Sequence, residues 1–385
     1  MDAMDDQTRL ADFDGYLRAK EPGMREKAYA WKTAIGLQKV DGLTPSGYLI
    51  ETARRNIEGE ISLAESRALV TDYHKAKKRA RGDAADRLAE ADLVSQHITE
   101  VLSESSFTFS PEELVSIHRR LFEGVFAFAG RIRDYDITKA EWVLKGDTVH
   151  YGAAYRLLET LAFDFGQERA FSYMGLSETE IVRHVSRFVS NLWQIHAFGE
   201  GNTRTVGVFT IKYLRTLGFD VNNDVFAENA WYFRNALVRA NYTNVPKGIE
   251  ETTVYLEKFF RNLLLGERNV LQSRYLVVGG WRGRENADDP TSSPTSSPTS
   301  NVGRGLVLSA QVKRLLAVME GEMSRIALMR ALGLKDRVTF TGSYLAPALK
   351  VGLVEMTQPG SPRSPTQRYR LTVLGVSQRG GRQST

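Results

Sequence analysis

The chain has 385 residues, no cysteine and a formal net charge of +5, with 42% apolar and 25% charged residues. This length and composition are typical of a globular protein with two or three domains, and the lack of cysteine excludes disulfides and thiol chemistry. The sequence contains no run of about 18 apolar residues and no apolar signal segment near its start, so we expect a cytoplasmic protein without a membrane span.

The first third of the chain carries two helix-start signals. Ser62 and Glu65 have the spacing of a capping box, and Ser110-Pro111 combines an N-cap residue with a proline at the first helical position. The apolar residues after the second signal recur at helical period: Leu114, Ile117 and Leu121. Both regions are therefore predicted to be helical.

Residues 141–151 have a different pattern. They read Glu-Trp-Val-Leu-Lys-Gly-Asp-Thr-Val-His-Tyr, with apolar and β-branched residues on either side of Lys-Gly-Asp. This arrangement predicts a short β-hairpin, the only β element that the sequence indicates before residue 300.

Two predicted helices flank residues 196–204, His-Ala-Phe-Gly-Glu-Gly-Asn-Thr-Arg. The first helix begins at a capping box, Ser177–Glu180, and has one apolar face. The second begins near Asn202 and ends at Gly218, a residue suited to the position after a helix. The N–H groups and the positive dipole end at Asn202 would point into the turn, where they attract phosphate.

The turn between these helices collects residues with complementary chemistry. His196 is a candidate base, Glu200 a candidate metal ligand and Arg204 a phosphate-binding cation. Taken singly, each has an ordinary alternative role as a packed histidine, a solvated acid or a surface cation. Their occurrence in one turn favours chemistry on a phosphate ester. A zinc pair at His196 and Glu200 is not expected, because Gly201 interrupts the helix that would align them.

Residues 196–204 resemble the signature of the Fic (Fido) family, His-x-Phe-x-Asp/Glu-Gly-Asn-Gly-Arg-x-x-Arg. Most members of this family transfer AMP from ATP to a protein hydroxyl. The resemblance covers roughly Trp31 to Thr372 and implies a mainly α fold with a β-hairpin flap at 141–151. In the family this flap pairs with the backbone of the target protein; a plain surface hairpin is the alternative.

The resemblance implies roles for the catalytic residues of the motif. His196 would take the proton from a Ser, Thr or Tyr hydroxyl of the target, and Phe198 would anchor the loop in the core. Glu200 would hold Mg²⁺ between the α- and β-phosphates.

The nucleotide-binding part of the motif departs from the family at two positions. Gly201 and Asn202 would surround the α-phosphate and Arg204 would contact the β-phosphate. Thr203 replaces the second Gly of the motif within this nucleotide-binding segment, a small change at a helix start. Gly207 replaces the second Arg, so the usual cation for the γ-phosphate is missing.

Two further segments match family features in part. Phe233 and Asn241 have the spacing of residues that line the adenosine, although an ordinary amphipathic helix is an equal alternative. Residues 55–60 resemble the end of the Fic inhibitory helix, whose glutamate pairs with the second motif Arg. With Gly207 in that place, Glu58 would instead meet Arg204 and inhibit the enzyme; a plain helix end is the alternative.

The last part of the chain changes in composition and charge. A Ser/Thr/Pro-rich segment after Glu285 predicts an extended linker. Thirteen basic residues oppose four acidic ones between 302 and 385, a net charge of +9. Predicted elements follow in the order of a winged helix: helices at 309–319, 324–331 and 336–350, then strands at 353–357 and 367–372. Arg363, Arg368 and Arg370 would lie on or beside the wing.

These patterns predict an N-terminal helical region (1–105), a Fic core (106–270), a linker (271–303) and a small α+β winged-helix-like domain (304–377). The expected function is a protein adenylyltransferase that uses ATP and Mg²⁺ and modifies a target protein or itself. The basic tail suggests DNA as a partner, with docking to a protein as the alternative. A regulator that senses a nucleotide but transfers little, or transfer from a donor such as UTP or a CDP-linked metabolite, also fits. Fic proteins often pair, so a homodimer stays open.

Overall fold

The computed structural model describes residues 13–17, 22–77, 83–221, 224–280, 306–362, 364 and 366–379. In these residues the chain is mainly helical, as the sequence predicts, and a three-stranded sheet lies near the C-terminus. No helix in the described ranges is both long and apolar enough to cross a membrane.

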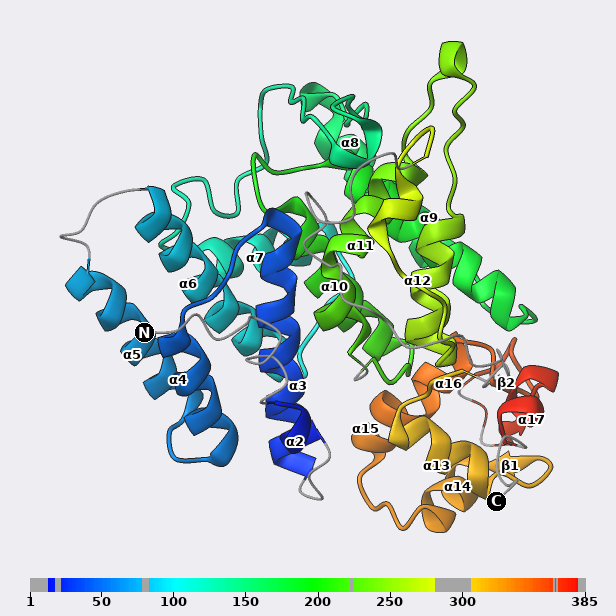
Figure 1. Cartoon of the computed structure of the whole chain (residues 1–385). Coiled ribbons are helices and arrows are strands. Elements are labelled where there is room, and N and C mark those ends of the chain that lie inside the picture. Colours follow the sequence, from blue (N-terminus) through cyan, green and yellow to red (C-terminus); the bar gives the residue numbers. More distant parts are fainter. Residues whose placement is uncertain are drawn as a thin grey trace.

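The N-terminal helices form one side of the molecule, drawn in blue and cyan in Figure 1. They are α2 (Asp14–Leu17), α3 (Pro22–Leu37), α4 (Gly47–Glu58), α5 (Leu63–Lys77) and α6 (Asp83–Ser103), with the 3₁₀ turn η1 (Gln38–Asp41) after α3. A small apolar cluster around Trp31 packs the first of these helices together. The predicted capping box is confirmed, because the Ser62 N–H donates to Glu65 Oε2 at 2.7 Å and the Glu65 N–H donates to Ser62 Oγ at 3.1 Å.

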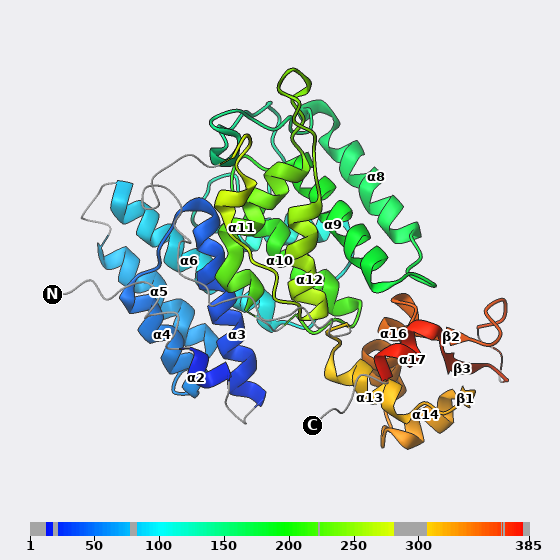
Figure 2. The same cartoon turned by 45° about the vertical axis from the view of Figure 1, so that its right-hand side comes forward.

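The central part of the chain contains the helix that starts at the predicted phosphate site, α10, and the helices around it. Its helices are α7 (Pro111–Phe122), α8 (Leu157–Ala170), α9 (Glu178–Ile195), α10 (Asn202–Thr216), α11 (Val225–Ala240) and α12 (Val254–Leu265), with 3₁₀ turns η2 (Trp142–Leu144), η3 (Ala154–Arg156), η4 (Val245–Lys247) and η5 (Ser273–Leu276). The other helices surround α10, which Figures 1 and 2 both place near the centre. Every residue from Asn202 to Leu214 is buried. The predicted starts of α7 at Ser110 and of α9 at Ser177 are confirmed.

The β-hairpin predicted at 141–151 is wrong. The segment contains η2, after which Lys145 takes a left-handed φ of 57°. The Glu141 N–H donates to the Asp147 carbonyl at 2.9 Å, and the Gly146 N–H donates to the Glu141 carbonyl at 3.0 Å, so the turn closes on itself. The physical reason is burial of the consecutive residues Val143 and Leu144, which a turn of helix allows and an alternating strand does not.

The C-terminal elements confirm the predicted order of three helical segments and a hairpin. They are α13 (Ala310–Val318), β1 (Met323–Ser324), α14 (Arg325–Ala331), α15 (Arg337–Thr339), the π-helical turn η6 (Phe340–Leu345), α16 (Ala346–Lys350), β2 (Val354–Met356), β3 (Arg368–Leu371) and α17 (Val373–Arg379). The antiparallel sheet has the order β1-β3-β2, with Met323 opposite Tyr369 and Glu355 opposite Arg370.

Residues 281–303 of the predicted linker (271–303) lie outside the described residues, as does Arg363. Residues 271–280 are described and contain η5, in which Leu276 is buried. Of the other predicted wing cations, Arg370 lies on β3 beside two acids, with Nε 2.6 Å from Glu355 and Nη1 3.3 Å from Glu322. DNA binding by this domain stays a prediction.

The C-terminal domain packs against the far end of α10. Gly218 has a φ of +83°, and a Cβ there would lie 2.8 Å from Val312 and 3.0 Å from Pro347. The Ser309 N–H donates to the Gly218 carbonyl at 2.6 Å, and the Asp220 N–H donates to that of Val307 at 2.8 Å. One helix therefore begins at the predicted phosphate site and ends at the domain contact (Figure 2).

Candidate active site

The turn between α9 and α10 is closed by the side chain of Asn202. Its Oδ1 accepts from the Phe198 N–H at 2.9 Å, and its Nδ2 donates to the Phe198 carbonyl at 2.7 Å. Both amide atoms are thus used inside the turn, and the residue is buried. Asn202 therefore shapes the loop instead of presenting its side chain to an anion, and the groups aimed at an anion are the backbone N–H donors at the start of α10.

Gly201 allows this turn to lie close to α7. It has a φ of +76°, and a Cβ there would lie 2.2 Å from the Phe122 ring, so no other residue fits. Thr203 has a structural contact, because the Trp193 indole N–H donates to its hydroxyl at 2.9 Å and ties α9 to α10. The predicted nucleotide contact of Thr203 stays a prediction.

His118 on α7 binds the backbone of the turn, a role that the sequence did not predict. Its Nε2 donates to the Glu200 carbonyl at 3.0 Å and its Nδ1 accepts from the Gly130 N–H at 2.8 Å. The imidazole stacks on Phe198 with ring centres 3.8 Å apart. Burial lowers the pKa of His118 to about 4, so the ring stays neutral at pH 7 and can make both bonds. The available signal was a histidine on the apolar face of a predicted helix.

His196 ends α9 with a left-handed φ of 50° and ψ of 56°. Its Nδ1 lies 3.1 Å from the Trp193 carbonyl oxygen, which can only accept, so Nδ1 carries the proton and Nε2 keeps a lone pair. Burial lowers the pKa of His196 well below its usual value, and the nearby Lys139 cation acts in the same direction. The site thus contains a neutral imidazole in the tautomer of a base, with the Tyr151 ring 4.1 Å from it.

Glu200 points into the pocket from the same turn. Its Oε1 and Oε2 lie 3.0 and 3.1 Å from Lys139 Nζ, and its side chain is 42% exposed. Among the described residues no group of three or more His, Cys, Asp and Glu side chains could hold a metal ion. Mg²⁺ in nucleotide sites commonly uses one or two carboxylates together with phosphate oxygens and water, so Glu200 alone is a donor set that fits it.

Arg204 is fully buried and held by acidic residues of the N-terminal helices. Its Nε lies 2.8 Å from Asp41 Oδ2 and its Nη2 lies 2.6 Å from Glu90 Oε1. Nη1 donates to Gln38 Oε1 at 3.1 Å, and the guanidinium lies 4.8 Å from the centre of the Phe122 ring. All three nitrogens therefore have side-chain partners, and a phosphate that reached Arg204 would have to compete with two carboxylates.

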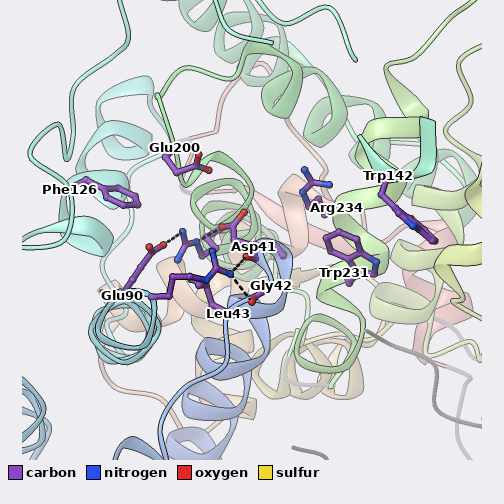
Figure 3. Close-up of a pocket in the computed structure, with 12 residues that line it drawn as sticks. Asp41, Gly42, Leu43, Glu90, Phe126, Trp142, Glu200, Trp231 and Arg234 are labelled. Atoms are coloured by element: carbon purple, nitrogen blue, oxygen red, sulfur yellow. Dashed lines mark hydrogen bonds and ion pairs between the residues drawn. The ribbon is translucent and has the colours of Figure 1, made fainter. Parts of the chain in front are cut away.

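A pocket of about 670 Å³ connects these residues. Figure 3 shows its walls, which come from residues 40–43 at the end of η1, from α6, from the turn containing Glu200 and from α11. Arg87 and Glu90 line it from α6, and Trp231 and Arg234 line it from α11. Trp142 also lines the pocket. The pocket thus combines carboxylates, guanidinium groups and the indole rings of two tryptophans.

Phe233 and Asn241, which the resemblance places beside the adenosine, do not line this pocket, and their contact with a nucleotide stays a prediction. Phe233 is fully buried and packs against the rings of Phe226 and Phe259, each with its centre 5.0 or 4.9 Å away. The Nδ2 atom of Asn241 donates to Ser190 Oγ on α9 at 2.9 Å. The helix instead turns Trp231 toward the pocket.

The predicted contact between Glu58 and Arg204 is also wrong. Glu58 ends α4 and accepts hydrogen bonds from the Tyr16 hydroxyl and from Arg54. Arg54, one helical turn before Glu58, thus binds the glutamate together with Tyr16. The carboxylates on Arg204 belong to Asp41 and Glu90.

Gly207 lies one turn along α10 from Arg204, away from the pocket. A Cβ at this position would be 3.4 Å from Leu37 and 3.7 Å from Phe226. An apolar contact surface therefore surrounds the place where the family motif has its second Arg.

Comparison with known proteins agrees with the motif. In the curated protein adenylyltransferase VbhT of Bartonella schoenbuchensis, 165 residues are 29% identical to this chain, a match that covers 37% of this chain and 33% of that protein. A crystal structure of a Fic family protein from Desulfovibrio desulfuricans G20 aligns over 97% of this chain and 98% of its own, with 18% identity and a TM-score of 0.43. Residues 108–214 match the Fic/DOC family, and residues 310–372 match the C-terminal domain of Fic-like proteins (filamentation induced by cAMP). The chain therefore carries a Fic/DOC family domain followed by a Fic-like C-terminal domain.

Proposed function

We propose that this chain is a protein adenylyltransferase that transfers AMP from ATP to a Ser, Thr or Tyr hydroxyl of a target protein or of itself. The observation that carries the proposal is the neutral His196, whose Nε2 has no proton, at the turn that leads into the N-terminus of α10. The partial similarity to an adenylyltransferase supports the same class of reaction.

In this reaction the acceptor hydroxyl oxygen bonds to the α-phosphorus of ATP, the α–β phosphoanhydride bond breaks, and pyrophosphate leaves. Nε2 of His196 takes the hydroxyl proton. Backbone N–H groups at the start of α10 stabilise the charge that develops on the α-phosphate oxygens. Glu200 would hold Mg²⁺, whose charge offsets that of the phosphates when it is bound.

Three contacts have to change before transfer. Lys139 binds the Glu200 carboxylate, the Tyr151 ring covers the imidazole, and two acids hold Arg204. Arrival of a metal-bound triphosphate would exchange the first contact, since the metal and the ammonium compete for the same oxygens. The described arrangement thus corresponds to a resting form of the enzyme.

A second candidate function is a nucleotide-sensing regulator that transfers little. The observation that favours it is the engagement of all three Arg204 nitrogens by protein side chains. A different donor is a third option, because position 207 supplies no cation for a γ-phosphate.

The test uses purified protein with host lysate, Mg²⁺ and ATP labelled at the α-phosphate, with labelled UTP and a labelled CDP-linked metabolite in parallel. Wild type and His196→Ala are compared, and His184→Ala serves as a matched histidine away from the pocket. Label from ATP on protein that His196→Ala abolishes and His184→Ala retains would support the proposal. ATP binding without label on protein would favour the sensor, and label from another nucleotide would change the donor.

A further inference from the structure

The missing second motif Arg leaves open which residue binds the phosphate tail of the donor. Position 207 itself faces Leu37 and Phe226, so its neighbourhood is apolar and turned away from the pocket. A cation for the tail must then come from another element of the pocket wall.

Three arginines line the pocket, and their partners differ. Arg204 has a side-chain partner on each nitrogen, two of them carboxylates. Arg87 Nη2 donates to the carbonyl oxygens of Asp41 and Gly42 at 3.3 and 3.0 Å. Arg234 binds Glu141 Oε2 through Nη1 at 2.7 Å, and its Nε and Nη2 have no partner among the described residues. Nε and Nη1 of Arg87 likewise have no partner among the described residues. What sets Arg234 apart is the way in which its guanidinium is held.

The surroundings of Arg234 hold its guanidinium in place. Glu141 is fully buried, and its other oxygen accepts from the Tyr151 hydroxyl at 3.0 Å. The guanidinium lies 5.3 Å from the centre of the Trp231 ring, and the side chain is 15% exposed. A guanidinium held in this way loses little entropy on binding a phosphate, and its planar group of donors matches phosphate oxygens in pairs. Figure 3 shows Arg234 and Glu200 both projecting into the pocket.

We propose that Arg234 binds the phosphate tail of the donor nucleotide, beyond the α-phosphate, in the role that position 207 cannot fill. Glu141 and Tyr151 act as positioning residues for Arg234. This inference rests on the proposed nucleotide transfer, and it makes Arg234 the residue by which the enzyme distinguishes di- and triphosphates from monophosphates.

The test measures the dissociation constants of AMP, ADP and ATP with Mg²⁺ by calorimetry on the full chain. Arg234→Gln alone would leave Glu141 buried without its cation, so Arg234→Gln is combined with Glu141→Gln, which removes both charges together. Arg234→Lys keeps the charge without the paired donors. Arg87→Gln tests the other arginine of the pocket that has available donors, and Arg156→Gln is the control at an exposed arginine that does not line the pocket.

We expect the double variant to weaken the binding of ATP and ADP roughly 10- to 100-fold, the range for hydrogen bonds to charged groups. Its affinity for AMP should stay at the wild-type value. The ATP affinity of Arg234→Lys should fall between those of the double variant and wild type. Arg87→Gln should change the ratio of ATP to AMP affinity less than the double variant does, and Arg156→Gln should match wild type. An unchanged ratio of ATP to AMP affinity in Arg234→Lys and in the double variant would overturn the inference. If the double variant does not fold, the ratio in Arg234→Lys decides.

The two proposals fail separately. Wild-type protein that binds ATP through Arg234 but transfers no label would refute the transferase and leave the inference standing. If wild type transfers label but the Arg234 variants weaken AMP, ADP and ATP binding by the same factor, the inference is refuted and the transferase stands. Wild-type protein that binds none of the three nucleotides would refute both.

Discussion

The two walls of the pocket are built in different ways. The turn from His196 to Asn202 is held by hydrogen bonds between residues within a few positions of each other. Its backbone carbonyls also accept from two distant side chains, His118 and Arg133. The opposite wall is held by ion pairs between residues far apart in the chain, such as Arg204 with Glu90 and Arg234 with Glu141.

One wall of the pocket therefore determines the geometry of the reacting groups, and the other determines the charge that a ligand meets. Hydrogen bonds to backbone groups, local ones together with those from His118 and Arg133, fix the shape of the turn. The base and the helix N-terminus are therefore already placed before a ligand arrives. Ion pairs on the other wall can exchange partners, because phosphate oxygens and carboxylates compete for the same guanidinium donors. We therefore expect changes in the turn to affect the reaction rate and changes in the ion pairs to affect nucleotide affinity.

The largest effect is expected at His196, the proposed base. Replacing it with Ala should lower the transfer rate by about 10²- to 10⁴-fold, the contribution of a positioned general base, with little effect on the dissociation constant of ATP. Single-turnover transfer of label at saturating ATP measures the rate.

The pH dependence of the rate sharpens this prediction. Because the pKa of His196 lies well below 6.5, the base stays deprotonated and the rate should stay level as the pH falls through 6.5. A wild-type rate that fell with an apparent pKa of about 6.5 would contradict the buried, neutral imidazole. A rate unaffected by His196→Ala would contradict its role as a base.

His118 should make the stability of the chain depend on pH. Its folded pKa of about 4 lies below the unfolded value of 6.5, so the stabilisation is fully present above pH 6.5 and is lost as the pH falls toward 4. The loss amounts to about 3 kcal/mol, because each pKa unit corresponds to about 1.4 kcal/mol.

Urea unfolding between pH 7 and pH 4.5 measures this effect. His118→Gln lacks the titrating ring, so its free energy of unfolding should vary less with pH than that of wild type. Equal slopes for the two proteins would contradict the neutral, doubly bonded His118.

A smaller effect is expected at Asn202, which closes the turn. Asn202→Ala should destabilise the chain by about 1–3 kcal/mol, because two backbone groups of Phe198 lose their partner in a buried turn. The transfer rate should fall about 10- to 100-fold as the N–H groups lose their alignment.

Asn262→Ala is the matched control, since this asparagine of α12 likewise bonds both the N–H and the carbonyl of one residue, Asn269, and does not line the pocket. It should cost stability without changing the rate constant of transfer. Thermal unfolding and single-turnover rates of both variants separate the two effects. Equal rates in the two variants would mean that the closed turn does not matter for the reaction.

The same division explains what the sequence could predict. The capping box at Ser177, the start of α10 at Asn202 and the end at Gly218 depend on neighbouring residues, and all three were predicted. The C-terminal order of helices and strands was predicted for the same reason. Local propensity and capping are visible in a short window of sequence.

The features that could not be predicted depend on contacts between distant residues or on an interruption of the regular helical repeat. No local pattern links Arg204 to Glu90 or to Gln38, which are 114 and 166 positions away. On α11, Asn229 has non-helical angles (φ −121°, ψ 27°), so an ideal helical period does not tell which face meets the pocket. The choice between Phe233 and Trp231 therefore needed the tertiary structure.

The smallest effect is expected at Glu58, and it provides the sharpest contrast with the ion pairs of the pocket. Glu58→Gly removes a carboxylate bound to Tyr16 and Arg54, so ATP affinity and transfer rate should both stay at wild-type values. Glu90→Gln is the matched variant, because it removes a carboxylate of the pocket that binds Arg204.

Glu90→Gln should tighten ATP binding several-fold, roughly the 1 kcal/mol that a partly exposed charge contributes, since one negative charge beside the phosphates is lost. Calorimetry on both variants makes the comparison direct. A Glu58→Gly enzyme that bound ATP more tightly or worked faster than wild type would mean that α4 reaches the site in a form other than the one described. If ATP affinity changes only in Glu90→Gln, the carboxylate that weakens ATP binding lies on α6 and not on α4. The segment 55–60 is then a helix end whose Glu58 binds Tyr16 of α2.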